Sequence, residues 1–184
     1  MEDDKKLPPE VFGIFCGNIN QDSAQKLSNA FGIASNNGVT HIHLLYQSTG
    51  GSVSDGIFLY NLFKSLPLKL ILYNAGQVSS AAAVAYLGAQ GRKTSASATF
   101  MLHRSTNAPQ VATVANMTAL VKNLSLDDQR TEAILREHIT LPDELWTLFD
   151  RHDIYLSAAE SIQYGLAQEI ADFSPPSDAK IFSI

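Results

Sequence analysis

Two adjacent serines, Ser79 and Ser80, stand where an apolar, strand-like run over residues 68–73 gives way to an alanine-rich, helix-forming segment. At the entrance of a helix, free backbone N–H groups and the positive end of the helix dipole face outward. A serine there can cap the helix, which is the commoner use of this residue. It can also attack a carbonyl carbon as a nucleophile, with neighbouring N–H groups receiving the oxyanion.

Acyl transfer by a serine also needs a base and a carboxylate that orients the base. Histidine is the usual base, because its protonation equilibrium lies near working pH. His103 ends a strand-like segment, whereas His138 and His152 lie in charged or polar stretches and are expected to be exposed. A histidine at a strand end is more often structural than catalytic. Spacing alone does not select Asp153 among the acids, so the residues by themselves do not establish a triad.

A pair of glycines, Gly50 and Gly51, directly follows the second predicted strand. Glycine allows backbone angles that other residues resist, and it lets a ligand approach the backbone N–H groups. A simple turn is the plainer interpretation. In parallel sheets, however, ligands gather at the carboxyl ends of the strands. The glycine pair and the two serines both lie at such ends, and can therefore converge on one site.

Other reactive residues have less support. Cys16 is the single cysteine, so no internal disulfide can form, and its apolar strand-like surroundings predict a buried, inert thiol. His41 and His43 would share one face of a strand, but no carboxylate or cysteine lies nearby in sequence to complete a metal site. Residues 91–94 (Gly-Arg-Lys-Thr) do not match a phosphate-binding loop, because the glycine is not followed by lysine and a hydroxyl residue in the required order. We therefore expect neither a metal nor a cofactor.

Composition narrows the class of protein. The chain has 184 residues, 45% hydrophobic and 17% charged, which is typical of one globular domain with its own core. The net charge of −5 and the lack of a basic stripe argue against nucleic acid as a partner. No apolar window is long enough to span a membrane, and the charged N-terminus does not resemble a signal peptide. A single cysteine fits a cytoplasmic protein.

Strands and helices are expected to alternate, which indicates right-handed βαβ units and a mainly parallel sheet. In chain order, beginning with a strand, these segments are residues 11–16, 23–33, 39–46, 54–65, 68–73 and a helix from about 79. Asp22 or Ser23 is expected to cap the first helix. Residues 1–10 should form a loose charged leader, and a tail should begin at residue 175.

A long helix is expected over about residues 112–139, and a helix of this length can project from a small domain and pair with a neighbour. Apolar side chains follow helical spacing at Met117, Leu120, Val121 and Leu124. The charged residues are expected to form a solvated face: Asp127, Asp128, Arg130, Glu132 and Arg136. Farther on, Pro142 opens a shorter helix, and Ser157 with Glu160 forms a capping box.

Four blocks of the sequence resemble the proteolytic subunit of the Clp protease, a family of serine peptidases. Residues 48–53 (Ser-Thr-Gly-Gly-Ser-Val) resemble the family's Ser-Pro-Gly-Gly, and residues 76–81 (Gly-Gln-Val-Ser-Ser-Ala) its Gly-Gln-Ala-Ala-Ser-Met. Residues 101–103 (Met-Leu-His) resemble Met-Ile-His. Residues 153–166 resemble the run from Asp-Xaa-Phe-Leu-Ser-Ala to Tyr-Gly-Leu. Each block is weak alone, but four in order, within residues 11–172, are specific.

The resemblance implies a site. It makes Ser80, the second of the two serines, the nucleophile, with His103 as the base and Asp153 as the orienting acid. The backbone N–H groups of Gly51 and Ala81 would form the oxyanion hole. The stretch after the histidine would pair with an extended substrate strand.

The resemblance also implies an architecture and partners. We expect an α/β, crotonase-like fold of repeated ββα or βαβ units over residues 11–184, in which the helix at about 112–139 is the handle that interlocks two rings. Substrates would be peptides or unfolded proteins, cleaved inside a homo-oligomer of heptameric rings. An AAA+ unfoldase is an implied partner, although the short segment before Val11 suggests a divergent member with a shortened N-terminus and argues against a conventional one.

The chain departs from the family pattern beside each expected site residue. The departures are Thr49 for proline, Ala82 for glycine, Arg104 and Ser105 for Gln-Pro, and His152 for arginine. These departures are also compatible with a homologue that keeps the fold but has an assembly or regulatory role instead of a catalytic one. A crotonase-type acyl-CoA enzyme is another alternative, but no adenine or pantetheine signal is present. A serine–lysine peptidase would need a catalytic lysine, and Lys122 lies on a predicted solvent face.

Overall fold

In the computed structural model, which describes residues 7–107 and 113–184, the central element is a sheet of six strands. Along the chain these strands are β1 (Glu10–Cys16), β2 (His41–Gln47), β3 (Lys69–Asn74), β5 (Gly91–Thr94), β8 (Glu169–Ile170) and β9 (Ile181–Ser183). Across the sheet they lie in the order β8-β5-β3-β2-β1-β9, and every neighbouring pair runs parallel. The mainly parallel sheet expected from the alternating segments is therefore confirmed.

A second, smaller sheet is formed by β4 (Gln77–Ser79), β6 (Thr99–Leu102) and β7 (Ile154–Ser157). Strand β6 runs parallel to β4 and antiparallel to β7. Strand β4 lies where the sequence predicted only a turn between a strand and a helix. Three residues are too few to show an alternating pattern, so pairing with β6, rather than local propensity, makes this strand. Strand β4 ends at Ser79, directly before Ser80, and β6 ends at Leu102, directly before His103.

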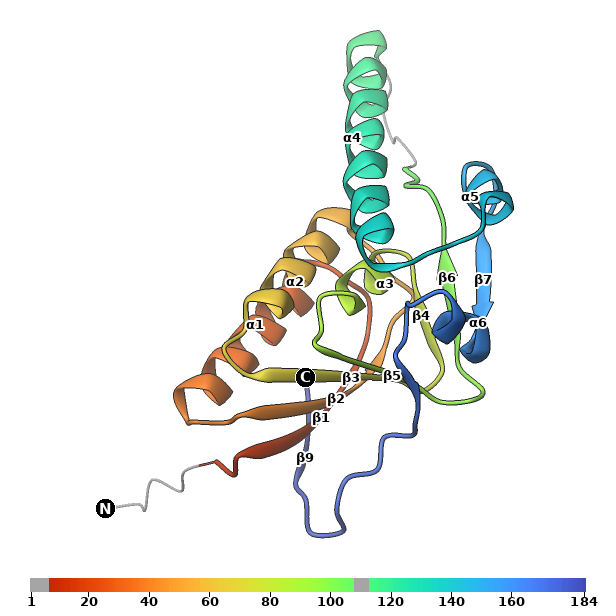
Figure 1. Cartoon of the computed structure of the whole chain (residues 1–184). Coiled ribbons are helices and arrows are strands. Elements are labelled where there is room, and N and C mark those ends of the chain that lie inside the picture. Colours follow the sequence, from red (N-terminus) through yellow and green to blue (C-terminus); the bar gives the residue numbers. More distant parts are fainter. Residues whose placement is uncertain (1–6, 108–112) are drawn as a thin grey trace.

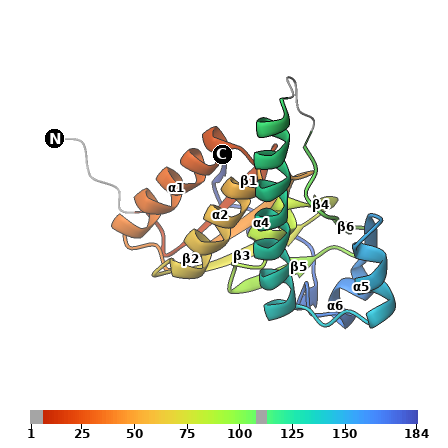
Figure 2. The ribbon, with the colours of Figure 1, turned by 90° about the horizontal axis from the view of Figure 1, so that it is seen from above.

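Six helices complete the described residues: α1 (Gln21–Asn36), α2 (Val53–Ser65), α3 (Ala81–Tyr86), α4 (Val114–His138), α5 (Asp143–Phe149) and α6 (Ala158–Gln163). Helices α1 and α2 lie side by side on one face of the larger sheet (Figures 1 and 2). Helix α2 also packs closely on α3, because a Cβ at Gly56 would lie 2.7 Å from the carbonyl oxygen of Ala81. All six residues of α3 are buried, which explains a helix composed mostly of alanine.

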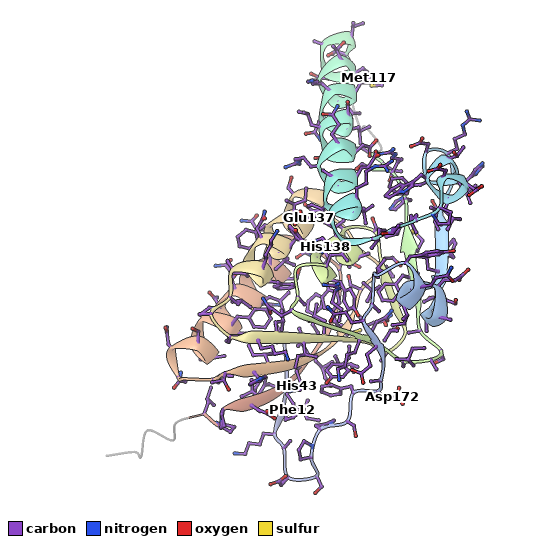
Figure 3. All side chains as sticks on the ribbon, viewed as in Figure 1. Phe12, His43, Met117, Glu137, His138 and Asp172 are labelled. Carbon is purple, nitrogen blue, oxygen red and sulfur yellow. The ribbon has the colours of Figure 1, made fainter. Side chains whose placement is uncertain are left out.

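Strand β2 shows how the sequence places its side chains. Ile42, Leu44 and Tyr46 are buried, while the residues between them are only half-buried. This period of two is that of a strand with one face on the main core. His43 lies on the other face, where its ring stacks on Phe12 with centroids 4.9 Å apart (Figure 3). Both faces of β2 are therefore packed where the strand ends, shortly before the glycine pair.

The start of α1 differs from the prediction. The N-cap is Asn20 rather than Asp22 or Ser23. Asn20 Oδ1 accepts a hydrogen bond from the Ser23 N–H at 2.9 Å, and Ser23 Oγ accepts one from the Asn20 N–H at 2.9 Å. This reciprocal pair is a capping box, so the helix begins two residues earlier than expected. The capping box predicted for Ser157 and Glu160, at the start of α6, is confirmed.

The segment predicted to be a tail contains the edge strand β9. Residues 181–183 pair in parallel with β1, and the N–H of Ile184 donates to the carbonyl of Ile14 at 2.9 Å. The two prolines at residues 175 and 176 suggested an end of structure, whereas they lie in the connection that leads back to the sheet. Of the leader expected over residues 1–10, residues 1–6 lie outside the described residues, and Glu10 already belongs to β1.

Helix α4 has two different halves. Its N-terminal half stands away from the sheets (Figure 1), and Val114 is 86% exposed, with Met117 and Val121 also exposed. Its C-terminal half is packed, and there the predicted solvated face is confirmed for Arg130 and Arg136, which are exposed, but is wrong for the three acids, which are buried or half-buried. Asp127 is only 8% exposed, because it accepts hydrogen bonds from Arg130 and from Asn123.

The last turn of α4 rests on α2, and Figure 3 shows Glu137 and His138 at this point. His138 Nε2 lies 2.9 Å from the hydroxyl of Tyr60, so the expectation that this histidine is exposed is wrong. Burial, with a smaller contribution from the nearby Arg92, lowers the pKa of His138. Among the helices in the described ranges, none has the length and apolar character needed to cross a membrane.

Candidate active site

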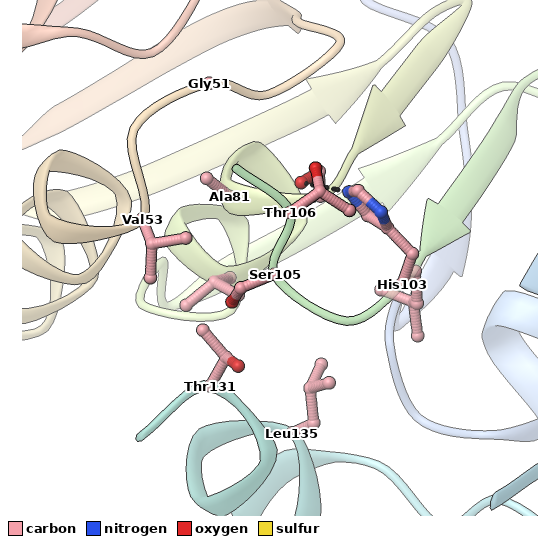
Figure 4. Close-up of a pocket in the computed structure, with 11 residues that line it drawn as sticks. Gly51, Val53, Ala81, His103, Ser105, Thr106, Thr131 and Leu135 are labelled. Atoms are coloured by element: carbon pink, nitrogen blue, oxygen red, sulfur yellow. Dashed lines mark hydrogen bonds between the residues drawn. The ribbon is translucent and has the colours of Figure 1, made fainter. Parts of the chain in front are cut away.

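Ser80 occupies the N-cap position of α3 but does not cap it. Its backbone has φ 55° and ψ −130°, and in the described ranges no other residue except glycine has positive φ. Such a conformation costs about 1–3 kcal/mol and persists only where the surroundings impose it. The hydroxyl lies 2.7 Å from Nε2 of His103 instead of bonding to the helix (Figure 4). The capping interpretation is therefore wrong for this serine.

Backbone contacts impose the conformation of Ser80. Its N–H donates to the carbonyl of Met101 at 2.8 Å, and the N–H of Ser79 donates to the carbonyl of Ser48 at 3.0 Å. On the other side lies Gly50, where an added Cβ would come within 2.7 Å of the Cβ of Ser80. The glycine turn and the serine thus lie in contact, as the positions of both at strand ends predicted.

His103 and Asp153 are brought opposite each other by the antiparallel pairing of β6 and β7. Leu102 pairs with Ile154, so the next residue on one strand faces the preceding residue on the other. His103 Nδ1 lies 3.9 Å from Asp153 Oδ1, which is beyond hydrogen-bond distance. The histidine side chain is 22% exposed and the aspartate side chain 51%. The acid is therefore near the base, but not yet bonded to it.

Two backbone amides lie beside Ser80 in the same pocket. Gly51 and Ala81 both line it, and within the described part of the chain neither N–H donates to a backbone carbonyl. Ala81 begins α3, where N–H groups have no partner within the helix. Gly51 has φ 147°, and a Cβ there would lie 2.1 Å from the carbonyl oxygen of Ile19. Only glycine fits this position, so a backbone amide can be presented where a side chain would collide.

The pocket has a volume of about 60 Å³ and extends from Ser80 to helix α4. Its far wall is formed by Thr131 and Leu135, one helical turn apart, while Val53 stands nearer the glycine turn (Figure 4). These wall residues were not predicted from the sequence. Their spacing of four residues on a helix was the available signal, but no local pattern tells which face of a long helix meets a site.

The loop after His103 is fastened to the same helix. The N–H of Ser105 donates to Asp128 Oδ1 at 2.7 Å, and Arg104 forms an ion pair with Glu132 at 2.7 Å. Burial alone would raise the pKa of Glu132, but hydrogen bonds from Arg136 and from Arg104 hold this pKa below its usual 4.5. These acids were predicted to be plain solvated charge, and they instead anchor the segment that follows the candidate base.

The other candidate residues lie elsewhere. His43 Nδ1 lies 2.9 Å from the hydroxyl of Tyr73, and no cluster of three or more potential metal ligands occurs in the residues that the structure covers. Cys16, predicted to be buried, is exposed at the end of β1. Lys122 is exposed, as expected from its helix face. Ser79 is fully buried, and its hydroxyl has no hydrogen-bond partner among the described residues.

Comparisons with known proteins give a consistent result. The family model described as Clp protease matches residues 9–174. The ATP-dependent Clp protease proteolytic subunit 2 of Pseudomonas aeruginosa is 26% identical over 131 residues, which cover 70% of this chain and 65% of that protein. The match thus spans just under two thirds of the relative's length. The ATP-dependent Clp protease proteolytic subunit 3 of Rhizobium etli is 26% identical over 156 residues, covering 84% and 80%.

A solved structure shares the fold. A mutant of ClpP1 from Listeria monocytogenes superposes with a TM-score of 0.77 at 22% sequence identity, covering 88% of this chain and 91% of the other. At this identity the likeness concerns the backbone arrangement alone.

Proposed function

The chain belongs to the Clp protease family and has its crotonase-like α/β fold, and from this premise we propose that it is a serine endopeptidase. Ser80, His103 and Asp153 would form the triad. The observation that supports the proposal most is the 2.7 Å contact between the Ser80 hydroxyl and His103 Nε2, in a pocket lined by two residues whose amides donate to no backbone carbonyl of the described residues. A serine hydroxyl in contact with an imidazole is the arrangement that activates it for attack.

In the proposed reaction, Ser80 Oγ attacks the carbonyl carbon of a peptide bond while His103 Nε2 takes the hydroxyl proton. The negative oxygen of the tetrahedral intermediate is held by the N–H groups of Gly51 and Ala81. His103 then gives its proton to the leaving amine, and the C–N bond breaks. Water, deprotonated by the same imidazole, hydrolyses the acyl-enzyme. Asp153 stabilises the imidazolium, which requires the 3.9 Å separation to close by about 1 Å to a charge-assisted hydrogen bond.

The proposal extends to the assembly. Substrates would be peptides or unfolded proteins, cleaved in a cytoplasmic, homo-oligomeric chamber built from heptameric rings. The exposed apolar side chains on the projecting half of α4 support a contact with another copy, because isolated surface helices rarely present several. A ring of seven 20.0 kDa chains would give a light-scattering mass of about 140 kDa (7 × 20.0), or a multiple of it. An AAA+ unfoldase is a further partner that the family resemblance implies.

The decisive test is labelling with a fluorophosphonate probe, which reacts with activated serines. Wild type and Ser79→Ala should be labelled, and Ser80→Ala should not. The neighbouring serine is a matched control because its hydroxyl is fully buried and away from the histidine contact. An unlabelled wild type, or labelling that persists in Ser80→Ala, would refute the assignment.

A non-catalytic homologue is the second candidate, and the long separation between His103 and Asp153 is the observation that favours it. The two candidates differ in a simple assay. Peptide hydrolysis that coelutes with the oligomer and disappears in Ser80→Ala excludes the non-catalytic role. A wild-type protein that assembles but hydrolyses no peptide would instead support the non-catalytic role.

A further inference from the structure

Arg104, the residue that follows His103, contacts two other elements through its side chain. Its Nη1 lies 2.7 Å from Glu132 Oε2 on α4, and its Nη2 forms an ion pair with Asp150 at the end of α5. Its guanidinium also lies over the ring of Phe149, 4.6 Å from the centroid. The side chain is only 26% exposed, so these contacts are partly shielded from solvent. Such paired and stacked arginines are well ordered.

The segments joined by this arginine carry the candidate base and the candidate acid. His103 is its neighbour on one side, and Asp150 stands three residues before Asp153 on the other. The backbone register of β6 and β7 brings the two catalytic candidates opposite each other but stops at Ile154. Asp153 is half exposed and, in the described ranges, makes no hydrogen bond of its own. The ion pair between Arg104 and Asp150 therefore links the segment after β6 to the turn before β7, beyond the last backbone pair of the two strands.

We propose that Arg104 is a positioning residue, which holds the turn at residues 150–153 so that Asp153 stays within reach of His103. The proposal rests on the peptidase function proposed above. An arginine is required because its planar group spans two carboxylates and stacks on a ring at the same time, which a lysine ammonium cannot do. Glu132 on α4 holds the guanidinium of Arg104 in place. The position of Asp153 therefore depends on the packed C-terminal half of α4.

Arg136 provides a matched control. It also pairs with Glu132, with Nε 2.7 Å from Oε1, and it also lies over an aromatic ring of α5, 3.9 Å from the centroid of Trp146. Its ion pair lies within α4, and its ring contact joins α4 to α5, so it offers the same two kinds of contact without touching the loop after His103. Unlike Arg104, it is not adjacent to His103, and within the described residues it makes no ion pair with Asp150.

The experiment compares kcat and KM for peptide hydrolysis in wild type, Arg104→Gln, Asp150→Ala and Arg136→Gln. Release of the turn should lower kcat about tenfold in the first two variants, because a displacement of about 1 Å at a triad has at least this effect. KM should stay within about twofold, since the substrate-contacting groups remain. Arg136→Gln should match wild type. Arg104→Lys should recover part of kcat, because a lysine still reaches one carboxylate.

The two main variants remove opposite charges, which separates positioning from simple electrostatics. Loss of a positive charge and loss of a negative charge beside the site would shift the pH profile of kcat in opposite directions. Positioning predicts that both variants lose kcat at the pH optimum, and that the double variant is no worse than either single one.

The proposal is overturned if Arg104→Gln keeps wild-type kcat, if the two charge variants change kcat in opposite directions, or if Arg136→Gln is impaired equally. If Arg104→Gln does not fold, kcat of Asp150→Ala and of Arg104→Lys is compared with that of wild type and Arg136→Gln in its place. Failure of the peptidase assignment itself is recognised separately, because then wild type is neither labelled at Ser80 nor active.

Discussion

The two halves of the candidate site are held in different ways. Ser80 is fixed by backbone hydrogen bonds to β6 and by the glycine turn, and its hydroxyl contacts His103 at 2.7 Å. The contact between His103 and Asp153 is 3.9 Å long, and the turn before the aspartate is held by the side chain of Arg104. The first half is formed by the fold itself, whereas the second half depends on side chains from α4 and α5.

This difference has a physical meaning. Backbone pairing in a buried sheet is formed cooperatively with the core, so the nucleophile and base come together whenever the protein folds. An exposed acid held by an ion pair costs little to displace, because partly exposed salt bridges contribute little stability. Changes in the first half should therefore lower activity more than changes in the second half.

The largest effect is expected from Gly51→Ala. The new Cβ would meet the carbonyl oxygen of Ile19 at 2.1 Å, so the turn and its amide must move away from Ser80. We expect kcat to fall about a thousandfold, as when an oxyanion donor is lost, together with a clear loss of stability in urea. Gly32→Ala in α1 is the matched control, because no atom lies within 4 Å of its added Cβ. Normal activity in Gly51→Ala would disprove the rigid first half.

Asp153→Asn should have the next largest effect. The asparagine has nearly the same shape but cannot stabilise the imidazolium, so kcat should fall about a hundredfold or more. Labelling of Ser80 by the fluorophosphonate probe should slow in parallel, while the melting temperature stays unchanged because the side chain is half exposed. Unchanged kcat would show that the second half takes no part in the reaction.

A pH effect is expected at Glu132, which anchors the second half. Its pKa in the folded protein lies below the usual 4.5, so its stabilising effect is complete above pH 4.5 and is lost as the pH falls through the folded-state value. Glu132→Gln should therefore melt at a lower temperature than wild type at neutral pH, and the difference should close in acid. Thermal unfolding of both proteins across this range measures it. A gap that stays constant with pH would contradict the ion-pair explanation.

The smallest effect is expected from Ser79→Ala. The buried hydroxyl has no hydrogen-bond partner among the described residues, so removing it should stabilise the protein by about 1 kcal/mol. Activity should not change, because the hydroxyl does not face His103. Denaturant unfolding measures the gain. Ser95→Ala provides a parallel case, because its buried hydroxyl also has no partner within residues 7–107 and 113–184. Loss of activity in Ser79→Ala would mean that the two serines share a role.

The sequence predicts much of the first half of the site. Apolar runs located β1, β2 and β3, and the rule that ligands gather at strand ends brought Gly50 and Gly51 to the serine pair. Local signals did not reveal strand β4 or the positive φ of Ser80, because both arise from pairing with distant β6. Composition at the helix mouth favoured a cap, and only tertiary contacts turn the hydroxyl toward His103 instead.

The residues of the second half of the site are harder to predict from the sequence. A pattern of charges on a long helix is the same whether the face meets solvent or another segment, so Asp127, Asp128 and Glu132 were assigned wrongly to a solvated face. His138 was misassigned for the same reason. The importance of Arg104 could be noticed as a departure from the family pattern, but its partners on α4 and α5 lie 28 and 46 residues away.

Strand β9 covers an edge of β1 that would otherwise present a row of free N–H and C=O groups. The cover is thin, because only three residues pair, and Ile181 and Phe182 remain exposed. If this strand detached, the uncovered ribbon would be an apolar template for the same ribbon of another molecule. Protection against such edge-to-edge association thus depends on the three residues of β9.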